Sequence, residues 1–377
     1  MDGMLGAVGA RFHHPRESWR SGLGGSGGWR EHAHGGVDLR GDRVISRRPK
    51  APHMRIRPLA FVTASAVVVA CFAMASLGEI PGSNAVDLPG AWNRLADAPT
   101  KRQEVSYVTL DGDLHLLGWS RAHHVYDPAT DSWRMRAKLP VQLNHVQAVA
   151  YGGRIYVIGG LTSWPDGDVD TVFIYDPGTN RWTQGARMPA GRGAGGVAVY
   201  QGKIYYAGGL HDGVAVRWFD VYDPATNRWS SLPGMPRARE HFHATVANGR
   251  LWAIGGRQGA INSTIAQTDA YNFATGRWET GYAPIPTKRG GFAVGVAGSE
   301  VIVFGGEGGG VQSAVEAYDT STNRWRTLEP MARPRHGIQA AACGGAFYIA
   351  TGGTRQGGGG ATTYHDVFRP TAGTGCG

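Results

Sequence analysis

The chain has 377 residues, of which 42% are hydrophobic and 18% charged, so it can form one large domain or two ordinary ones. The chain contains 59 glycines, about twice the usual share of ~7%, together with 12 tryptophans and 14 tyrosines. The glycines do not follow a collagen period, so this composition predicts an all-β fold rich in hairpins. Residues 1–57 hold 11 basic and 5 acidic residues and so carry +6 of the formal net charge of +9, which excludes the basic pI as evidence for a nucleic-acid partner of the folded part.

Residues 1–53 are predicted to be a basic, disordered leader. They are rich in Gly, Arg and His and show no sustained apolar period, so they cannot bury enough surface to offset their chain entropy. The histidines at 13–14 and at 32 and 34 have no fixed scaffold, and we assign no metal to them. Met54 opens a segment typical of a signal peptide, so we expect residues 1–53 to be an over-extended start.

Residues 54–80 are predicted to be a signal peptide or a transmembrane helix. The chain carries no charged residue over 58–77, a length at the border between a signal-peptide core and a membrane span of ~20 residues. Arg55 and Arg57 directly precede this stretch, which predicts an N-terminus in the cytoplasm and the rest of the chain outside.

Three fates of this apolar segment stay open. Signal peptidase could cleave it at the small residues Ala73 and Ala75, it could remain as a membrane anchor, or Cys71 could become a lipidated N-terminus. All three export the remainder of the chain. We therefore expect an extracytoplasmic protein (secreted, periplasmic or at the cell surface), with a linker at 81–90 between the apolar segment and the folded part.

A motif of the form Tyr-Asp-Pro-x-Thr-x-x-Trp recurs along the remaining chain. Its full or degraded copies are residues 126–133, 175–182, 222–229, 271–278 and 318–325. With Trp92 at the start, the tryptophans are 41, 49, 47, 49 and 47 residues apart. Between successive tryptophans an apolar run ends in a Gly-Gly pair, at 159–160, 208–209, 255–256, 305–306 and 352–353, whereas the first unit has Gly118-Trp119.

This pattern resembles the kelch repeat, which has a period of ~50 residues. The resemblance extends over 91–369 and implies a six-bladed β-propeller at 91–377, similar to exported bacterial kelch proteins. Apolar runs such as Arg154–Ile158 predict strands buried on both faces, and the Asp-Pro segments predict turns. The tryptophan is expected to fill the wedge between blades. The hairpins between strands A and B are expected near residues 111, 152, 201, 249, 298 and 345.

The two ends of the repeat array are incomplete in complementary ways. Residues 91–95 form a D strand without the A, B and C strands before it, and the last unit ends with a C strand near Phe368. We predict that the N-terminal D strand joins the C-terminal blade and closes the ring. Such closure removes exposed sheet edges, and the propeller is expected to be monomeric.

One column of the aligned repeats, directly before strand A, consists almost entirely of arginine. It reads Arg102, Leu143, Arg192, Arg239, Arg289 and Arg335. The adjacent columns add Glu104, Asn144, His145, Glu240, His241 and His336. A propeller places these positions near its central channel, where guanidinium groups suit carboxylate or sulfate ligands. The alternative is that the arginines bind backbone carbonyls of a neighbouring blade.

The function predicted from these columns is that of a binding scaffold for a protein or glycan ligand of anionic character. The predicted binding residues are the five arginines of the column together with His145 and His336. Loops between strands B and C would set specificity, because loops on a rigid scaffold are the usual recognition elements. They are Leu161–Asp170, Arg257–Thr268 and Thr354–Thr363.

Two enzyme families with kelch propellers provide an alternative. Galactose oxidases hold copper with Tyr and His, and Tyr364-His365 is such a pair, but no convincing further ligands accompany it. N-acetylneuraminate epimerases are similar in architecture. For an epimerase, Glu240 and His241 beside Arg239 are the candidate catalytic groups. No catalytic triad, phosphate-binding loop or zinc-ligand spacing is present, so we expect neither a metal nor a cofactor.

Two cysteines remain in the repeat region. Cys343 lies at the predicted hairpin between strands A and B of the last blade, and Cys376 comes after the C strand of that blade. In an oxidising compartment they could form a disulfide that holds the C-terminal tail.

Overall fold

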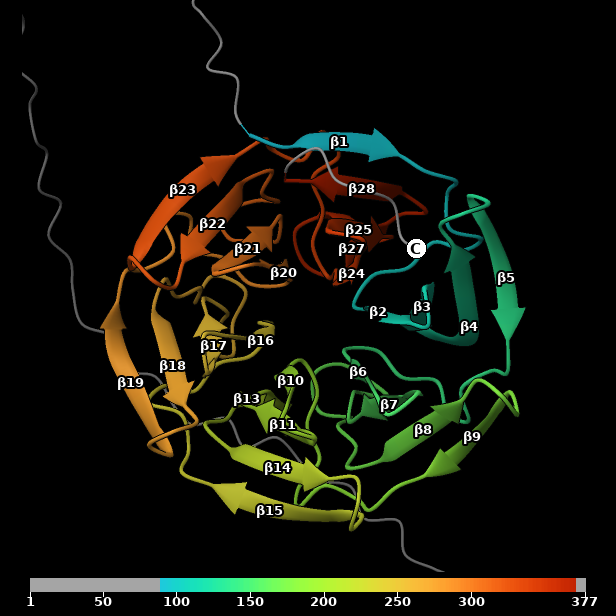
Figure 1. The fold of residues 1–377 in the computed structure, drawn as a ribbon, viewed down its shortest axis with the longest axis horizontal. Helices are drawn as coiled ribbons and strands as arrows, with labels where there is room; N and C mark the ends of the chain where they lie inside the picture. Colours follow the sequence, from blue (N-terminus) through green and yellow to red (C-terminus); the bar gives the residue numbers. More distant parts are fainter. Residues whose placement is uncertain (1–88, 371–377) are drawn as a thin grey trace, which may run out of the picture. The chain divides into compact units, whose positions relative to one another are not determined.

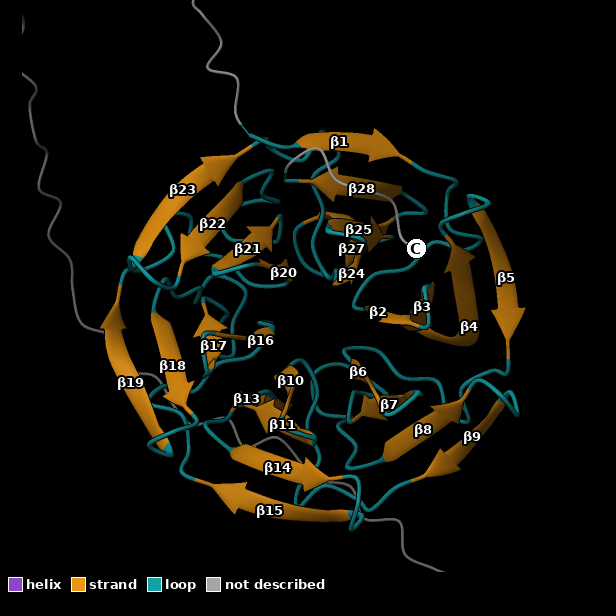
Figure 2. Cartoon of the chain, in the orientation of Figure 1, coloured by secondary structure: helices purple, strands orange, loops and turns teal. Residues whose placement is uncertain are grey.

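Six antiparallel sheets of four strands surround a common axis in the computed structural model, which describes residues 89–370 (Figure 1). The leader, the apolar segment with its possible lipidation site Cys71, most of the linker and Cys376 lie outside the described residues. Between residues 89 and 370 we find no helix long and apolar enough to cross a membrane, and Figure 2 shows strands and loops only.

Each sheet is one blade, with its first strand nearest the axis. Blade 1 is β2 (Ser106–Leu110), β3 (Asp113–Gly118), β4 (Ser120–Asp127) and β5 (Ser132–Arg136). Blade 2 is β6 (Gln147–Tyr151), β7 (Arg154–Ile158), β8 (Val172–Asp176) and β9 (Arg181–Gln184). Blade 3 is β10 (Gly196–Tyr200), β11 (Lys203–Ala207), β14 (Phe219–Asp223) and β15 (Arg228–Leu232).

The second half of the ring repeats this order. Blade 4 is β16 (Ala244–Ala247), β17 (Arg250–Ile254), β18 (Thr268–Asn272) and β19 (Arg277–Tyr282). Blade 5 is β20 (Ala293–Ala297), β21 (Glu300–Phe304), β22 (Val315–Asp319) and β23 (Arg324–Leu328). Blade 6 is β24 (Ala340–Cys343), β25 (Ala346–Ala350), β28 (His365–Arg369) and β1 (Ala91–Arg94).

Two B–C loops carry small hairpins of their own. They are β12 (Leu210–His211) with β13 (Val214–Ala215), and β26 (Gly353–Arg355) with β27 (Gly359–Ala361).

The predicted ring closure is confirmed. Strand β1 pairs antiparallel with β28, and Trp92 lies opposite Phe368 in the register. The outermost strand of blade 6 thus comes from the start of the propeller and the other three strands from its end (Figure 1). The edge of β28 is covered, which leaves it no free row of backbone groups for pairing with another chain.

The repeated tryptophan links each blade to the blade before it. In every blade its Nε1–H donates to a backbone carbonyl of the preceding blade, at 2.8–3.0 Å. Trp182 donates to the carbonyl of Ala137, for example, while Asn180 of the same motif accepts from the N–H of Ala137 at 2.9 Å. Asn180 also accepts from the hydroxyl of Tyr175 at 2.9 Å. The motif is therefore a clamp between blades, built from three of its side chains.

The core lies in the wedges between blades. One hydrophobic cluster joins Leu117 of blade 1 to Val157 and Phe173 of blade 2, and the ring of Trp182 packs against it. The predicted wedge-filling role of the tryptophan is confirmed. Because each blade buries its faces against two neighbours, the inner strands read as nearly continuous apolar runs.

The Gly-Gly pairs allow close approach of the next blade. Gly159 and Gly160 have φ values of +60° and +114°, and a Cβ on Gly159 would lie 2.2 Å from the carbonyl oxygen of Arg192. The N–H of Gly160 donates to that oxygen at 3.1 Å. Equivalent bonds join Gly209 to Arg239, Gly256 to Arg289, Gly306 to Arg335 and Gly352 to Arg102. Only glycine combines this backbone conformation with this contact.

Candidate functional site

The arginine column does not line the channel mouth. Arg102, Arg192, Arg239, Arg289 and Arg335 are each 0% exposed and extend into their own blades. Their guanidinium groups donate to second-strand carbonyls, such as that of Ala253 at 2.8 Å from Arg239. The prediction that they present a cationic surface to a ligand is wrong, because a guanidinium with no exposed area cannot reach one.

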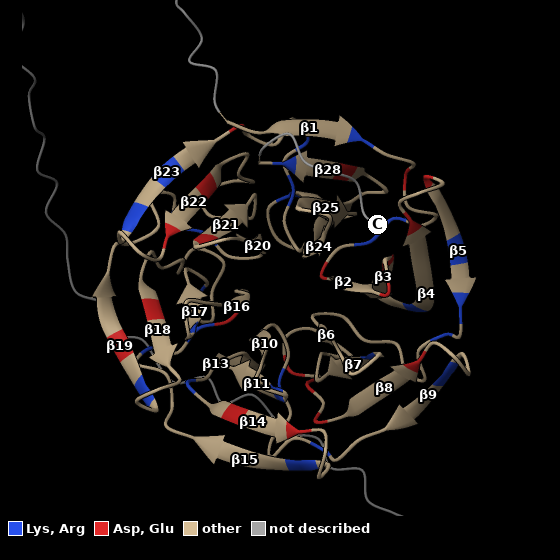
Figure 3. Ribbon diagram, in the orientation of Figure 1, with Lys and Arg blue, Asp and Glu red and all other residues tan. Residues whose placement is uncertain are grey.

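In four blades the buried arginine is neutralised by an acidic side chain on the third strand. The pairs are Arg192–Asp220, Arg239–Asp269, Arg289–Glu316 and Arg335–Asp366. Figure 3 shows these acidic positions on β14, β18, β22 and β28. Burial lowers the pKa of Arg239 to about 10, so it stays protonated at neutral pH.

The remaining two blades use other partners at the same two positions. In blade 1 the Nη2 of Arg102 lies 2.6 Å from Nδ1 of His124. In blade 2 the pair is Leu143 with Phe173, and both belong to one hydrophobic cluster. The column residue is polar in the five blades where its partner is polar and apolar in blade 2, where its partner is apolar, so the column has a structural role within each blade.

The residues two positions after each column position form a ring of backbone hydrogen bonds around the channel. The N–H of His145 donates to the carbonyl of Glu104, and similar bonds of 2.7–3.4 Å continue from blade to blade to Gly337 and back to Val105. All six ring residues have φ between +49° and +63°; they are Glu104, His145, Ala194, His241, Gly291 and Gly337. Glycine suits this conformation, yet three blades carry large polar side chains here.

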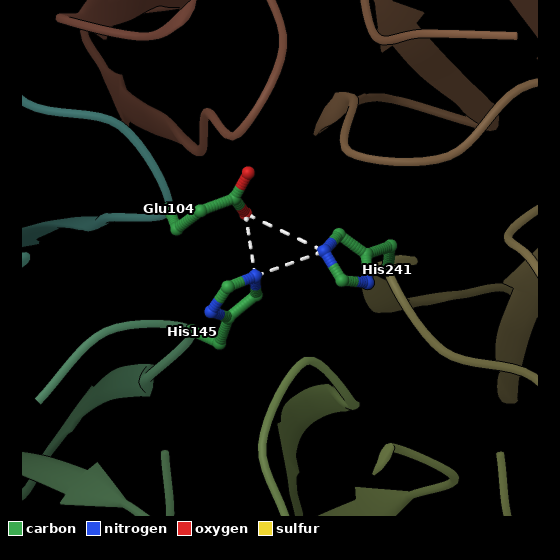
Figure 4. Close-up of side chains that lie close together, drawn as sticks. All are labelled: Glu104, His145 and His241. Atoms are coloured by element: carbon green, nitrogen blue, oxygen red, sulfur yellow. Dashed lines mark hydrogen bonds and ion pairs between the residues drawn. The ribbon is translucent and has the colours of Figure 1, made fainter. Parts of the chain in front are cut away.

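These three side chains converge on the axis (Figure 4). The Nε2 atoms of His145 and His241 are 2.9 Å apart. Oε2 of Glu104 lies 3.4 Å from Nε2 of His145 and 3.7 Å from Nε2 of His241. We call this group the axial triad.

A layer of charged groups surrounds the axial triad. Glu240 accepts a hydrogen bond from Nδ1 of His241 and lies 3.2 Å from Nε of Arg257. Arg257 also donates to Glu307 at 2.8 Å. Nδ1 of His336 lies 3.5 Å from Glu104 and 3.6 Å from Glu307. All of these side chains are buried or nearly so.

The pKa values reflect this crowding. Burial lowers the pKa of His145, and burial together with the charge of Arg257 lowers the pKa of His241 far below its usual range. Burial disfavours the charged form of His336, but Glu104 and Glu307 outweigh this effect and raise its pKa. Burial likewise disfavours ionised Glu104, but the surrounding histidines outweigh it and hold the pKa of Glu104 well below its usual range.

Above the axial triad a cavity of about 490 Å³ opens among the B–C loops. We call it the axial cavity. Its wall includes Trp119, Trp164 and Ile261, and its floor includes the axial triad and Gln103. Trp164 is 53% exposed and its ring stacks on that of His145 with centroids 5.0 Å apart. An apolar rim over a few polar groups is the usual form of a ligand pocket.

The structure thus brings together some of the predicted residues and separates others. His145, Glu240, His241 and His336 meet at the axis, and the loops Leu161–Asp170 and Arg257–Thr268 contribute to the cavity. The proposed epimerase arrangement is not formed, because Arg239 extends into its blade while Glu240 and His241 face the axis. Tyr364 packs on Arg333, and His365 is buried against Tyr126, as expected for a structural pair.

The sequence predictions missed the part that four residues play in this site. Gln103, Glu104 and Glu307 were assigned no function, although Glu104 stands in a column next to the arginines, and Arg257 was named only as the first residue of a loop. Polar residues at positions that are Gly or Ala in the other blades are the sequence signal that could have identified Glu104, His145 and His241.

Comparisons with known proteins agree with this architecture. The profile of the KLHDC2/KLHL20/DRC7 kelch-repeats domain matches residues 96–256, and that of the kelch motif matches 288–332. Kelch-like protein terF of Aspergillus terreus is 30% identical over 323 residues, which cover 77% of this chain and 70% of that protein. Beta-scruin of Limulus polyphemus is 30% identical over 86 residues, or 21% of this chain and 9% of its own length.

A solved structure shares the fold. The structure of YjhT superposes with a TM-score of 0.65 at 16% sequence identity, over 72% of this chain and 95% of YjhT. At this identity the likeness concerns the propeller alone. The terF match and the two kelch profiles show that the chain belongs to the kelch-repeat family of β-propeller proteins.

Proposed function

We propose that this chain is a protein-interaction scaffold that binds a segment of a partner protein in the axial cavity. Kelch propellers generally mediate protein interactions, and the family match to terF supports this class of function over an enzyme. The observation that carries the proposal is the axial cavity itself, a pocket of about 490 Å³ with two tryptophans in its wall.

Trp164 is the principal anchor for the partner. It is 53% exposed, and its ring is held by contacts with His145 and His241 at centroid distances of 5.0 and 5.5 Å. A fixed, exposed aromatic ring provides contact area with little further loss of side-chain entropy, which is typical of binding hot spots. Gln103 is 1% exposed, and neither polar atom of its amide has a partner among the described residues. A ligand in the cavity would supply one.

The ligand predicted from the arginine column requires revision on physical grounds. The five arginines are enclosed, and the groups around the axial cavity include three glutamates and one arginine, Arg257. An anionic segment would meet net negative charge there. We therefore propose a peptide ligand that contacts the cavity mainly through apolar and hydrogen-bonding groups, bound by a monomeric propeller.

Substitution of Trp164 by alanine is expected to weaken peptide binding by about 10- to 100-fold, the usual cost of removing an aromatic hot spot. Peptides selected from a random displayed library on the immobilised full chain would serve as ligands, with dissociation constants measured by fluorescence anisotropy. Trp218→Ala is the matched control, because Trp218 is 38% exposed in a B–C loop but does not line the cavity.

Equal affinities of the two tryptophan variants would contradict binding in the axial cavity. A glycan array run in parallel tests the other ligand class predicted from the sequence. If no peptide were selected and a saccharide bound in a manner that depends on Trp164, the ligand would be a glycan and not a protein.

We also propose that the propeller functions outside the cytoplasm. The support is in the sequence, where an uncharged stretch at 58–77 comes directly after Arg55 and Arg57. Residues 1–90 fused to a phosphatase that is active only after export are expected to give activity in a bacterial host, and Val68→Arg is expected to abolish it. Equal activity of the two fusions would rule out export through this segment.

A further inference from the structure

Three atoms that can donate a lone pair to a cation meet at the centre of the ring. They are Nε2 of His145, Nε2 of His241 and Oε2 of Glu104, separated by 2.9, 3.4 and 3.7 Å (Figure 4). The three residues come from blades 1, 2 and 4, so the closed ring is what brings them together.

The second nitrogen of each imidazole decides which atoms carry hydrogen. Nδ1 of His145 lies 2.5 Å from Oδ1 of Asn144, and Nδ1 of His241 bonds the carboxylate of Glu240. Both partners can accept, so a hydrogen on each Nδ1 leaves both Nε2 lone pairs directed toward the axis. Without an ion, the 2.9 Å contact between the two Nε2 atoms requires a hydrogen on one of them, and a bound cation would take the place of that hydrogen. An imidazole oriented by a carboxylate or amide oxygen on its other nitrogen is the usual arrangement around a bound metal ion.

The spacing fits a small cation. Bonds of about 2.0–2.2 Å to a tetrahedral ion place neighbouring ligand atoms about 3.3–3.6 Å apart. The three observed separations are 2.9, 3.4 and 3.7 Å, so one lies within that range, one below it and one just above it.

The backbone conformation is a separate sign of function. Glu104, His145 and His241 have φ of +52°, +53° and +49°, whereas two of the remaining three blades use glycine at this position. Strained non-glycine residues persist where their side chains serve a purpose. Ala194 of blade 3 shares the conformation, so four of the six positions carry a residue other than glycine, and three of these four are the potential ligands.

We propose that Glu104, His145 and His241 bind a divalent transition-metal ion such as Zn²⁺, with its fourth position open to the axial cavity. Two imidazoles and one carboxylate suit Zn²⁺ and its first-row neighbours, whereas Mg²⁺ and Ca²⁺ prefer oxygen ligands. This site departs from the expectation of no metal, because its ligands are dispersed over 138 positions of the sequence, from 104 to 241, and no short motif reveals them.

The surroundings favour a cation there. Glu104, Glu240 and Glu307 outnumber Arg257, the one arginine among the described residues of the cavity wall, and they still do so when His336, which lies against Glu104 and Glu307, is protonated. Gln103, with its unpartnered amide, borders the same cavity and is placed to bond a water or ligand on the open position.

The test is a titration of the untagged, chelator-treated full chain with Zn²⁺ and Co²⁺. We expect one ion per chain at the axis, intense visible Co²⁺ bands typical of four-coordinate geometry, and a rise of about 5–10 °C in the unfolding midpoint at saturating Zn²⁺. His241→Gly is expected to weaken this binding at least 100-fold and to remove the shift in midpoint. Because glycine occupies the position in blades 5 and 6, this variant is expected to fold.

Ala194→Gly is the matched control, since it makes the same backbone change in blade 3 without removing a ligand and should keep the metal response. The histidines of residues 1–53 are present in every variant, so any metal that they bind contributes equally to all the titrations. Glu104→Gln, nearly isosteric, should weaken binding while preserving the fold. Equal midpoint shifts in the parent and His241→Gly, or an equal response to Mg²⁺, would overturn the proposal. Neither outcome depends on peptide binding.

Discussion

Replacement of Asp220 by alanine is expected to lower the free energy of unfolding by about 3–5 kcal/mol, because it leaves the guanidinium of Arg192 buried without a counter-ion. Both side chains are almost fully enclosed, at 1% and 4% exposure. The remaining contacts of Arg192 do not replace the carboxylate: a carbonyl bond of 3.5 Å to Tyr206 and the faces of two aromatic rings. Urea titration followed by tryptophan fluorescence would measure the loss.

Blade 2 suggests the rescue experiment. It has Leu143 and Phe173 where blade 3 has Arg192 and Asp220, so the propeller itself shows that an apolar pair fits these positions. The double variant Arg192→Leu with Asp220→Phe is expected to be more stable than Asp220→Ala or Arg192→Leu alone. Replacing a buried ion pair by packed apolar groups is often neutral, whereas breaking it is not.

An exposed ion pair provides the control. Glu300 bonds Arg326, whose side chain is 44% exposed, so Glu300→Ala should cost at most about 1 kcal/mol. Losses of similar size for Asp220→Ala and Glu300→Ala would mean that the arginine column is not needed for stability. A double variant that is no more stable than Asp220→Ala or Arg192→Leu would mean that the two positions do not act as a pair.

Much of this fold could be predicted because the same short sequence motif recurs along the chain. The tryptophan recurs once in each repeat, so its place in the wedge between blades was predictable, whereas the bonds that Asn180 and Trp182 make to the preceding blade are visible only in the structure. Closure by β1 was inferred from two incomplete ends. These inferences require only local chemistry and a count of strands.

The direction of the arginine side chains could not be predicted from their column alone. A position beside the channel is compatible with a side chain that enters the channel or one that enters the blade. The deciding signal was in another column, two positions before the repeated tyrosine, where Asp220 precedes Tyr222 and Asp269 precedes Tyr271. Acidic residues in a buried strand require a buried cation, and the column arginine of the same repeat can supply it.

The axial triad was beyond sequence reasoning for a different reason. Glu104, His145 and His241 lie in separate repeats, and their approach to within 4 Å depends on the ring size and on the left-handed backbone at each position. Repeat alignment shows which residues share a column. It does not show how narrow the ring is at that column, and a site composed of one residue from each of several blades depends on that width.

Substitution of Trp92 by alanine is expected to cost about 3 kcal/mol, the lower end for a large aromatic side chain, because Trp92 is only partly buried. It is the one residue of β1 that is not exposed, and it packs on Phe304 and Phe368 at centroid distances of 6.0 and 5.0 Å. Its Nε1–H donates to the carbonyl of Glu329 at 3.0 Å. Among residues 89–370, β28 and β1 are the one pair of neighbouring blade strands that come from opposite ends of the propeller, and the side chain of Trp92 holds this seam together.

Amide hydrogen exchange would locate the effect at this seam. In Trp92→Ala the amides of β28 should exchange faster because β1 separates from it, while those of β22, the equivalent strand of blade 5, should keep their rates. Arg94→Ala, at an exposed position of the same strand, should change the free energy of unfolding by less than about 0.5 kcal/mol. If both variants unfolded at the same urea concentration, the packing of Trp92 would not be what closes the ring, and the four backbone pairs between β1 and β28 would have to close it unaided.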